Sequence, residues 1–172
     1  MLAIGDAILR IVNFVFLAIA LGIAGSLAAT TVTHTNPQVN FAVFAPAFGI
    51  LTSSFYGILA FFFAMFAWPL ILTIFDFLNF VFTFAAATAV AAGIGCHSCG
   101  NDDYNKNNTI NQGSGGRCRK AQAVVAFEYF SAFIFLFSLV FQIVSLVQGG
   151  LFGTSGPRKS TPRVGVPSMS QV

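Results

Sequence analysis

The sequence predicts an all-α membrane protein, an antiparallel bundle of four transmembrane helices. Three observations support this prediction. Charged residues make up 8% of the 172-residue chain, against about 25% in soluble domains. Hydrophobic residues make up 56%. The apolar residues also fall into four runs, each long enough for a helix to cross a hydrocarbon layer of about 30 Å; they cover residues 8–29, 41–67, 69–95 and 121–147.

The first run has two interpretations. Ser26-Leu-Ala-Ala29 is similar to a signal-peptide cleavage site. However, residues 1–7 carry an acid and no base, and the apolar stretch is longer than that of a usual signal peptide. We therefore expect a retained span, and an N-terminus of the mature protein near Met1.

The second and third runs are expected to form a tight hairpin. Residues 30–40 are a short polar link, and Pro46 falls in the first turns of the run that follows, where a missing backbone donor costs least. Trp68 suits the membrane interface, and Pro69 suits the first turn of the next helix.

The polar segment 96–120 is predicted to be an outer loop, with the tail 148–172 and both termini in the cytosol. Basic residues do not decide the orientation, because four lie on each side: Arg10, Arg158, Lys159 and Arg163 against Lys106, Arg117, Arg119 and Lys120. The glycosylation sequon at Asn107 and the cysteines of the loop favour the outer side. Residues 1–147 then form the bundle, and the Gly-, Ser- and Pro-rich tail is expected to be flexible.

Polar residues within the spans are the candidate site. Asp76 is the only charge in its run, and a charge at this depth must find a partner or stay neutral. In the predicted orientation Arg10 lies at a matching depth and could neutralise Asp76. The expected inner-leaflet cluster is Arg10, Asn13, Asp76, Asn79 and Gln142. It serves either as a structural ion pair or as a proton or substrate relay.

Glu128 is expected to form a separate outer charge, because it lies two turns into the last run from the opposite side. Its candidate partners are Lys120, Arg119 and His97.

Small residues recur at helical spacing along three of the runs. Such stripes allow helices to approach closely in a bilayer. They are Ala18, Gly22 and Ser26; Ala85, Ala89 and Gly93; and Ser131, Ser138 and Ser145. They predict packing inside one bundle or, alternatively, self-association into a homo-oligomer.

The cysteines favour a disulfide over a metal site. Cys96-His97-Ser98-Cys99 and Cys118 would need His34 from another loop to complete a structural zinc site. Outside the cell a bridge between Cys99 and Cys118 is the better interpretation, which leaves Cys96 as an odd thiol.

No catalytic constellation, cofactor motif or nucleic-acid surface is found, so we expect neither an enzyme nor a nucleic-acid binder. The net charge of +3 suits anionic lipid headgroups instead. The tail ends in Ser170-Gln171-Val172, a pattern typical of carboxylate capture. The preceding bases and hydroxyls of residues 158–163 form a candidate phosphorylation-controlled electrostatic switch.

Several stretches together resemble the fungal non-classical export protein 2 family of MARVEL-domain tetraspan proteins. The similarity extends over the whole chain, and its motifs are Phe75–Phe84, His97–Cys99, Gln112–Gly115, Cys118–Ala123, Val164–Pro167 and Ser170–Val172. The resemblance implies a plasma-membrane organiser of eisosome-associated furrow domains. It further implies sphingolipid sensing, recruitment of a cytosolic scaffold through the tail, and a link to leaderless protein export.

Two other functions compete with this expectation. A small transporter or channel would use Asp76 and Glu128, but the halves of the chain show neither a clear repeat nor a pair of interrupted helices. A lipid-modifying enzyme has no supporting residues. Long Phe-rich spans favour the organiser, and they suit a thick bilayer rich in sterol and sphingolipid.

Overall fold

The computed structural model describes residues 2–32, 34–57, 59, 69–95 and 97–149. The described residues are helical and contain no strand. The elements are α1 (Leu2–Ala29), α2 (Pro37–Gly49), the π-helix η1 (Ile50–Phe55), α4 (Pro69–Ile94), the short α5 (Asp102–Asn107) and α6 (Gly115–Gly149). Four segments are long and apolar enough to cross a membrane: Gly5–Ala29, Pro37–Phe55, Leu70–Ile94 and Gly115–Val144. The predicted four-span fold class is confirmed.

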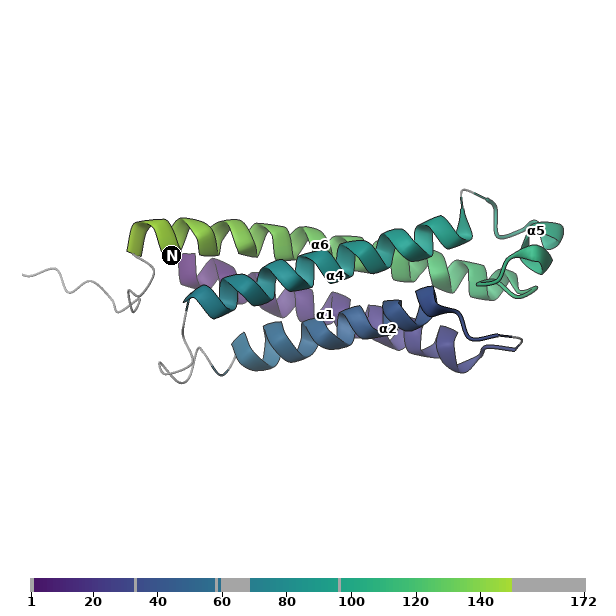
Figure 1. Cartoon of the computed structure of the whole chain (residues 1–172), viewed down its shortest axis with the longest axis horizontal. Coiled ribbons are helices and arrows are strands. Elements are labelled where there is room, and N and C mark those ends of the chain that lie inside the picture. The colour runs from purple at the N-terminus through teal and green to yellow at the C-terminus, as the bar shows by residue number, and fades with distance from the viewer. Residues whose placement is uncertain (1, 33, 58, 60–68, 96, 150–172) are drawn as a thin grey trace, which may run out of the picture.

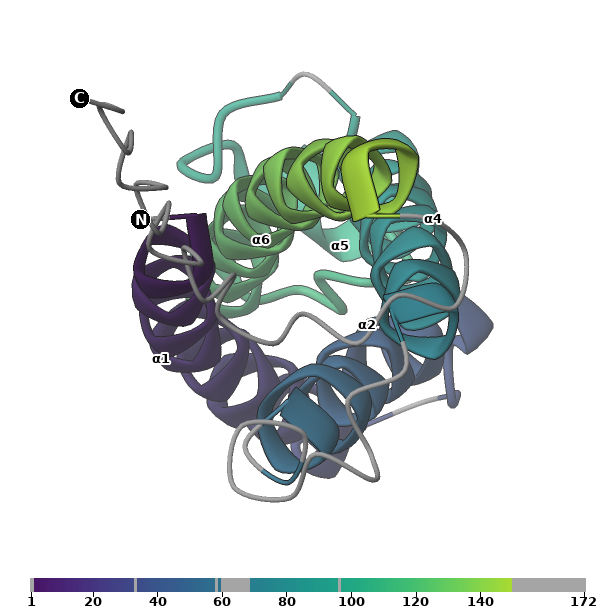
Figure 2. The same ribbon diagram turned by 90° about the vertical axis from the view of Figure 1, so that its left-hand side faces the viewer.

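The four long segments run antiparallel in chain order and form a ring. Viewed along the bundle, the order around the ring is α1, α6, α4 and α2 (Figure 2). The start of α1 and the end of α6 lie at one end, here called the terminal end; α5 and the connection from α1 to α2 lie at the opposite, loop end (Figure 1).

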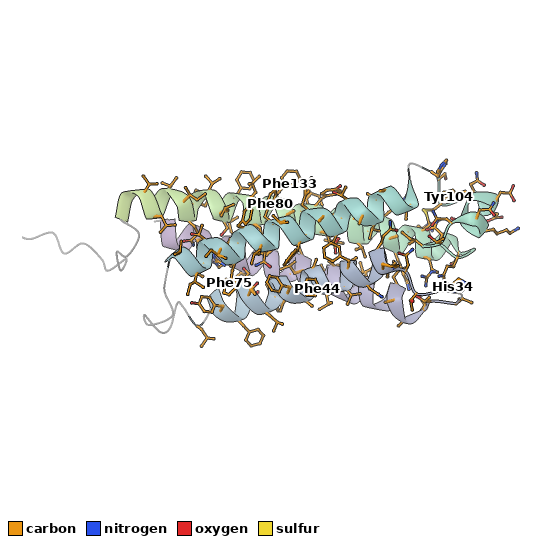
Figure 3. All side chains as sticks on the ribbon, in the orientation of Figure 1. His34, Phe44, Phe75, Phe80, Tyr104 and Phe133 are labelled. Carbon is orange, nitrogen blue, oxygen red and sulfur yellow. A yellow bond between two sulfur atoms is a disulfide. The ribbon has the colours of Figure 1, made fainter. Side chains whose placement is uncertain are left out.

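Side-chain size differs between the interior and the outer surface. Fully buried positions at the loop-end half include Ala24, Ala42, Val90 and Val124. Large apolar side chains face outward on each span; Phe44, Phe77 and Phe137 are 48%, 52% and 58% exposed. Phe133 of α6 likewise projects from the bundle surface (Figure 3). Phe135 and Leu17 are also fully buried, so the contrast lies mainly in the outer surface, where many exposed Phe side chains are expected if lipid, and not water, surrounds the helices.

The second span begins earlier than predicted. Asn36 accepts a hydrogen bond from the backbone N–H of Gln38 at 2.9 Å, and Pro37 opens the helix; both are preferred starting residues. The predicted start at residue 41 is therefore wrong, and Pro46 lies inside the helix and not in its first turns. The end of this span and the predicted hairpin at Trp68 lie outside the described residues.

A proline inside α2 is followed directly by a change of helix type. Pro46 has no N–H to donate to the preceding turn, and four residues later the chain widens into η1. The wide turns place Thr52, Ser53 and Ser54 on the bundle side, with Ser53 and Ser54 buried. Single π-helical turns are often found at functional positions, and this one brings the hydroxyl of Ser53 to Arg10 and that of Thr52 to Asn79.

The last span also begins earlier than predicted, at Gly115 and not at residue 121. The first begins at Leu2 and not near residue 8. Part of the predicted outer loop is therefore helical, and Arg117 belongs to the first turn of α6.

Candidate functional site

Arg10 of α1 and Asp76 of α4 form a two-pronged ion pair. One terminal guanidinium nitrogen donates to Asp76 Oδ2 at 2.9 Å, and the other to Oδ1 at 3.3 Å. Asp76 is fully buried. Parallel N–H···O bonds of this kind fix geometry as well as charge, and pairing is what makes an aspartate tolerable inside a span.

Three further side chains complete the ionic cluster. Arg10 Nε donates to Asp6 Oδ2 at 2.9 Å, and Ser138 Oγ of α6 donates to the other Asp6 oxygen at 2.6 Å. Arg10 also donates to Ser53 Oγ of η1 at 3.1 Å. Side chains from α1, η1 and α4 therefore contact the Arg10 guanidinium, and Ser138 of α6 joins them through Asp6. This ionic cluster (Asp6, Arg10, Ser53, Asp76 and Ser138) links the four segments at the terminal end.

The sequence reasoning missed Asp6, Ser53 and Ser138 as members of this cluster. The signals were present. Asp6 lies four residues before Arg10, the spacing at which opposite charges pair on a helix. The run Thr52-Ser53-Ser54 interrupts an otherwise apolar span.

Of the other predicted members, Asn79 makes a separate contact and Asn13 and Gln142 do not join. Asn79 Nδ2 donates to Thr52 Oγ1 at 2.8 Å, which links α4 to η1. Asn13 is buried, but its side-chain amide has no hydrogen-bond partner among the described residues. Gln142 is half-buried, and it has no hydrogen bond to the cluster among the described residues. The expectation that all five residues converge is therefore wrong, because Asn13 lies about one turn further from the terminal end than Arg10, and Gln142 lies about one turn nearer to that end than Ser138.

Glu128 does not pair with the predicted cations. It is fully buried, and neither carboxyl oxygen has a partner in the described part of the chain. Lys120 donates instead to Ser26 Oγ of α1 at 2.8 Å. Arg119 and His97 are both exposed, and the His97 ring lies against Tyr104. The predicted outer charge pair is wrong because those cations lie at the surface while Glu128 faces the interior.

At the loop end a second buried arginine closes the bundle. Arg117 donates from one terminal nitrogen to the carbonyls of Leu27 and Thr30 at 3.0 and 2.7 Å, and from Nε to the Ile110 carbonyl at 3.0 Å. The last carbonyls of a helix have no partner within it and carry partial negative charge. Arg117 of α6 therefore caps the C-terminus of α1, a role that the sequence reasoning did not assign.

Loop-end asparagines each hold a different backbone group. Asn108 Nδ2 donates to the Gly93 carbonyl at 2.8 Å and so caps α4. Asn105 Nδ2 donates to the Cys99 carbonyl at 2.9 Å, and Asn101 caps α5. Asn36 donates to Thr109 Oγ1 at 3.3 Å and so links the two loops. These hydrogen bonds make the polar segment at the loop end an ordered structure that covers that end of the bundle.

The structure joins Cys99 and Cys118 in a disulfide, with the two Cα atoms 5.6 Å apart. The described residues hold no group of His, Cys, Asp and Glu side chains suited to a metal. Cys96 lies outside the described residues. Asn107 is exposed on α5, and its side chain donates to the Asp103 carbonyl at 3.0 Å.

The small-residue stripes face in different directions. Ala18 and Gly22 are exposed on the outside of α1, and Ser26 is half-buried beside Lys120; the packed face is Leu17, Ala20, Ala24 and Leu27. The prediction that this stripe packs inside the bundle is wrong. On α4, Ala85 and Ala89 are half-buried. Gly93 lies directly against Gln38 and Ile110, and a Cβ there would displace the ends of those two side chains.

A shallow groove lies between α1 and α6 at the loop end, on the outer surface. Its lining is mostly apolar and includes two cations: Gly22, Ile23, Ser26, Ala123, Arg119 and Lys120. An apolar surface with neighbouring cations suits the boundary between lipid tails and anionic headgroups. The tail motif Ser170-Gln171-Val172 lies outside the described residues, as does residue 150 onward.

Comparison with known proteins gives consistent results. A family model described as "MARVEL: Membrane-associating domain" matches residues 2–141. Over the full length of both chains, the sequence is 69% identical to "Non-classical export protein 102" of Candida albicans. It is also 51% identical to "Non-classical export protein 2" of Saccharomyces cerevisiae, and 45% identical to "Non-classical export protein 2 homolog 1" of the same yeast, in both cases with full coverage of each chain. No solved structure matches the chain.

Proposed function

The chain belongs to the MARVEL membrane-associating domain family and, within it, to the non-classical export protein family, and from this premise we propose that it is a non-enzymatic organiser of the plasma membrane. It acts by lateral packing with lipids, with further copies of itself and with a cytosolic scaffold. The domains that it forms are furrow-like, of the eisosome-associated kind, and respond to sphingolipid.

The ionic cluster is the observation that supports an organiser over a conduit. A transporter needs polar groups that remain free to bind and release a substrate. Here Arg10 is engaged by Asp76, Asp6 and Ser53, and Asp76 is fully buried. The cluster uses its charges to hold α1, η1, α4 and α6 together, which favours a rigid scaffold.

The outer surface supports lipid and self-association as the working contacts. Gly22 leaves open space on the outside of α1, since nothing lies within 4 Å of a Cβ built there. Ala18 is exposed on the same face, and small residues allow another helix or a lipid chain to approach closely. Arg119 and Lys120 in the groove lining add attraction for anionic headgroups.

The proposed orientation places the loop end outside and both termini in the cytosol. Two features support it: a disulfide at the loop end, which is favoured in an oxidising compartment, and an exposed Asn107 in a glycosylation sequon. Protease treatment of intact cells should leave a C-terminal tag protected. Cleavage of that tag from outside would invert the orientation.

Imaging of the full-length protein in a fungal plasma membrane tests the organiser. With a fluorescent tag at the N-terminus, we expect clustered patches that disperse when residues 164–172 are replaced by a Gly/Ser stretch of equal length, with membrane insertion unchanged. Even spreading of the unaltered protein would contradict the organiser, and patches that persist after the replacement would contradict the tail's part in it.

A flux measurement tests the competing transporter. Purified protein in vesicles should conduct no ion or solute. A flux that disappears in Asp76→Asn would favour the transporter.

Leaderless protein export is a second candidate, and the names of the two fungal relatives, which refer to non-classical export, favour it. Under this proposal the protein would support release of cargo that lacks a signal peptide. The test compares secretion of a leaderless reporter in cells with and without the chain, with a signal-peptide reporter as the matched control. A loss of leaderless secretion alone would support export.

A further inference from the structure

Glu128 is the only charged residue in the middle of the bundle. Between the ionic cluster and Lys120, the facing stretches are residues 11–29 of α1, 37–49 of α2 and 77–94 of α4, and none of them contains Asp, Glu, Lys, Arg or His. On α6 itself the nearest titratable neighbour is Tyr129, whose hydroxyl is hydrogen-bonded to Thr88 at 3.0 Å. Glu128 is 0% exposed.

The basic residues of the described chain are all engaged elsewhere or lie at the surface. Arg10 binds Asp6 and Asp76, and Arg117 binds backbone carbonyls. Lys120 donates to Ser26, while Lys106 and Arg119 are exposed at the loop end. The three remaining bases, Arg158, Lys159 and Arg163, come after Gly149 in the sequence and lie outside the described residues. No cation faces Glu128 from the described residues.

Ser131 of α6 and Asn13 of α1 are buried polar side chains that, like Glu128, have no hydrogen-bond partner among the described residues. Ser131 is three residues further along α6 than Glu128 and therefore on the same face. Ser138 contacts Asp6 across the antiparallel α1–α6 pair. Seven residues inward along each helix from that contact are Ser131 and Asn13, which therefore lie level with one another. The exposed fraction is 1% for Asn13 and 0% for Ser131.

An unpaired carboxylate in such a place costs far more than a neutral acid. Neighbouring buried polar groups that lack protein partners are, moreover, the arrangement that holds ordered water. We propose that Glu128, Ser131 and Asn13 form an internal site that binds a proton on the Glu128 carboxyl and water between the three side chains. Asp76 differs from Glu128 because its carboxyl group is paired with Arg10.

Infrared spectroscopy of the full-length protein in lipid nanodiscs tests the proposal. At neutral pH we expect one protonated-carboxyl band that shifts in D₂O, disappears in Glu128→Gln and persists in Asp76→Asn. The absence of such a band, or its persistence in Glu128→Gln, would overturn the proton site. A band that fails to shift during prolonged exposure to D₂O would overturn the bound water.

The assignment holds even if Glu128→Gln does not fold, because the chain has only five acidic side chains. Asp102 and Asp103 are exposed on α5. A band that survives both Asp6→Asn and Asp76→Asn therefore belongs to Glu128, and a band lost in either variant refutes the proposal.

Serine substitutions test whether Ser131 belongs to the proposed site at Glu128. Ser131→Ala should change the frequency of the band, since it removes a hydroxyl on the same face. Ser138→Ala is the matched control, a buried serine on the same helix that bonds Asp6 instead, and it should leave the frequency unchanged. An equal response to the two substitutions would remove Ser131 from the site.

Discussion

The bundle has one arginine at each end whose guanidinium group is bound inside the protein, and the two groups have different kinds of partner. Arg10 at the terminal end is neutralised by the carboxylates of Asp76 and Asp6. Arg117 at the loop end has no carboxylate partner among the described residues and binds the carbonyls of Leu27, Thr30 and Ile110. The first depends on full charges within the spans, and the second on the partial charges at a helix end.

The difference predicts how strongly each end of the bundle is destabilised when its arginine is removed. Removing Arg10 would leave two carboxylates inside the membrane-spanning bundle. Removing Arg117 would leave neutral backbone carbonyls without this donor, which costs less than an unpaired charge. The loop end is also stabilised by a disulfide and by hydrogen bonds from asparagine side chains.

The largest effect is expected from Arg10→Met. Breaking a buried ion pair by removing one partner destabilises by about 3–5 kcal/mol. Unfolding of the purified protein in mild detergent should show this loss, and the double variant Arg10→Met/Asp76→Leu should recover part of it. A stability within experimental error of the unaltered protein would show that the pair does not hold the terminal end.

The next largest effect is expected at the disulfide. Its cysteines are 19 residues apart, and closing a loop of that order is worth about 3 kcal/mol by chain entropy. Cys118→Ser should lower the free energy of unfolding by that amount, while Cys96→Ser should leave the bridge intact in non-reducing peptide maps. Three free thiols in the unaltered protein would contradict the bridge.

Arg117→Met should cost less than Arg10→Met, about 2 kcal/mol, the order of cost for buried carbonyls left without a donor. Arg119→Met is the matched control, an exposed arginine two residues along the same helix, and it should change the unfolding free energy little. If Arg117→Met proved as damaging as Arg10→Met, the proposed difference between the two ends would fail.

The smallest effect is expected from Thr52→Val, which removes the hydroxyl that accepts from Asn79 at 2.8 Å. A hydrogen bond of this type is worth about 1 kcal/mol. A double-mutant cycle with Asn79→Leu isolates the pair, and a coupling energy of zero would show that η1 and α4 are held by packing alone.

The sequence was sufficient for the family and the four-span fold class, both of which are confirmed. Long apolar runs are direct evidence of membrane spans, and an isolated Asp76 requires a partner that few residues can supply. The helix boundaries were harder to predict from the sequence. The start at Pro37 depends on capping by Asn36, and the start of α6 at Gly115 falls within what reads as a polar loop.

Side-chain direction was the main thing that sequence reasoning lacked. Glu128 and Lys120 lie two turns apart on α6, yet one faces the interior and the other lies at the surface. Gly22 and Gly93 both belong to small-residue stripes, yet only Gly93 lies against neighbouring side chains. Such facing is set by the rotation of each helix in the ring, which no spacing rule within one helix determines.

The Asp6–Arg10 contact has a consequence for how the protein is made. Arg10 precedes Asp76 by 66 residues in the chain, so Arg10 is synthesised before its interhelical partner. Asp6, one turn away on the same helix, travels with it and compensates the charge from the outset. The first segment can thus be inserted as an electrically balanced unit, and Asp76 displaces nothing when it arrives, because the guanidinium still has its two terminal nitrogens to offer.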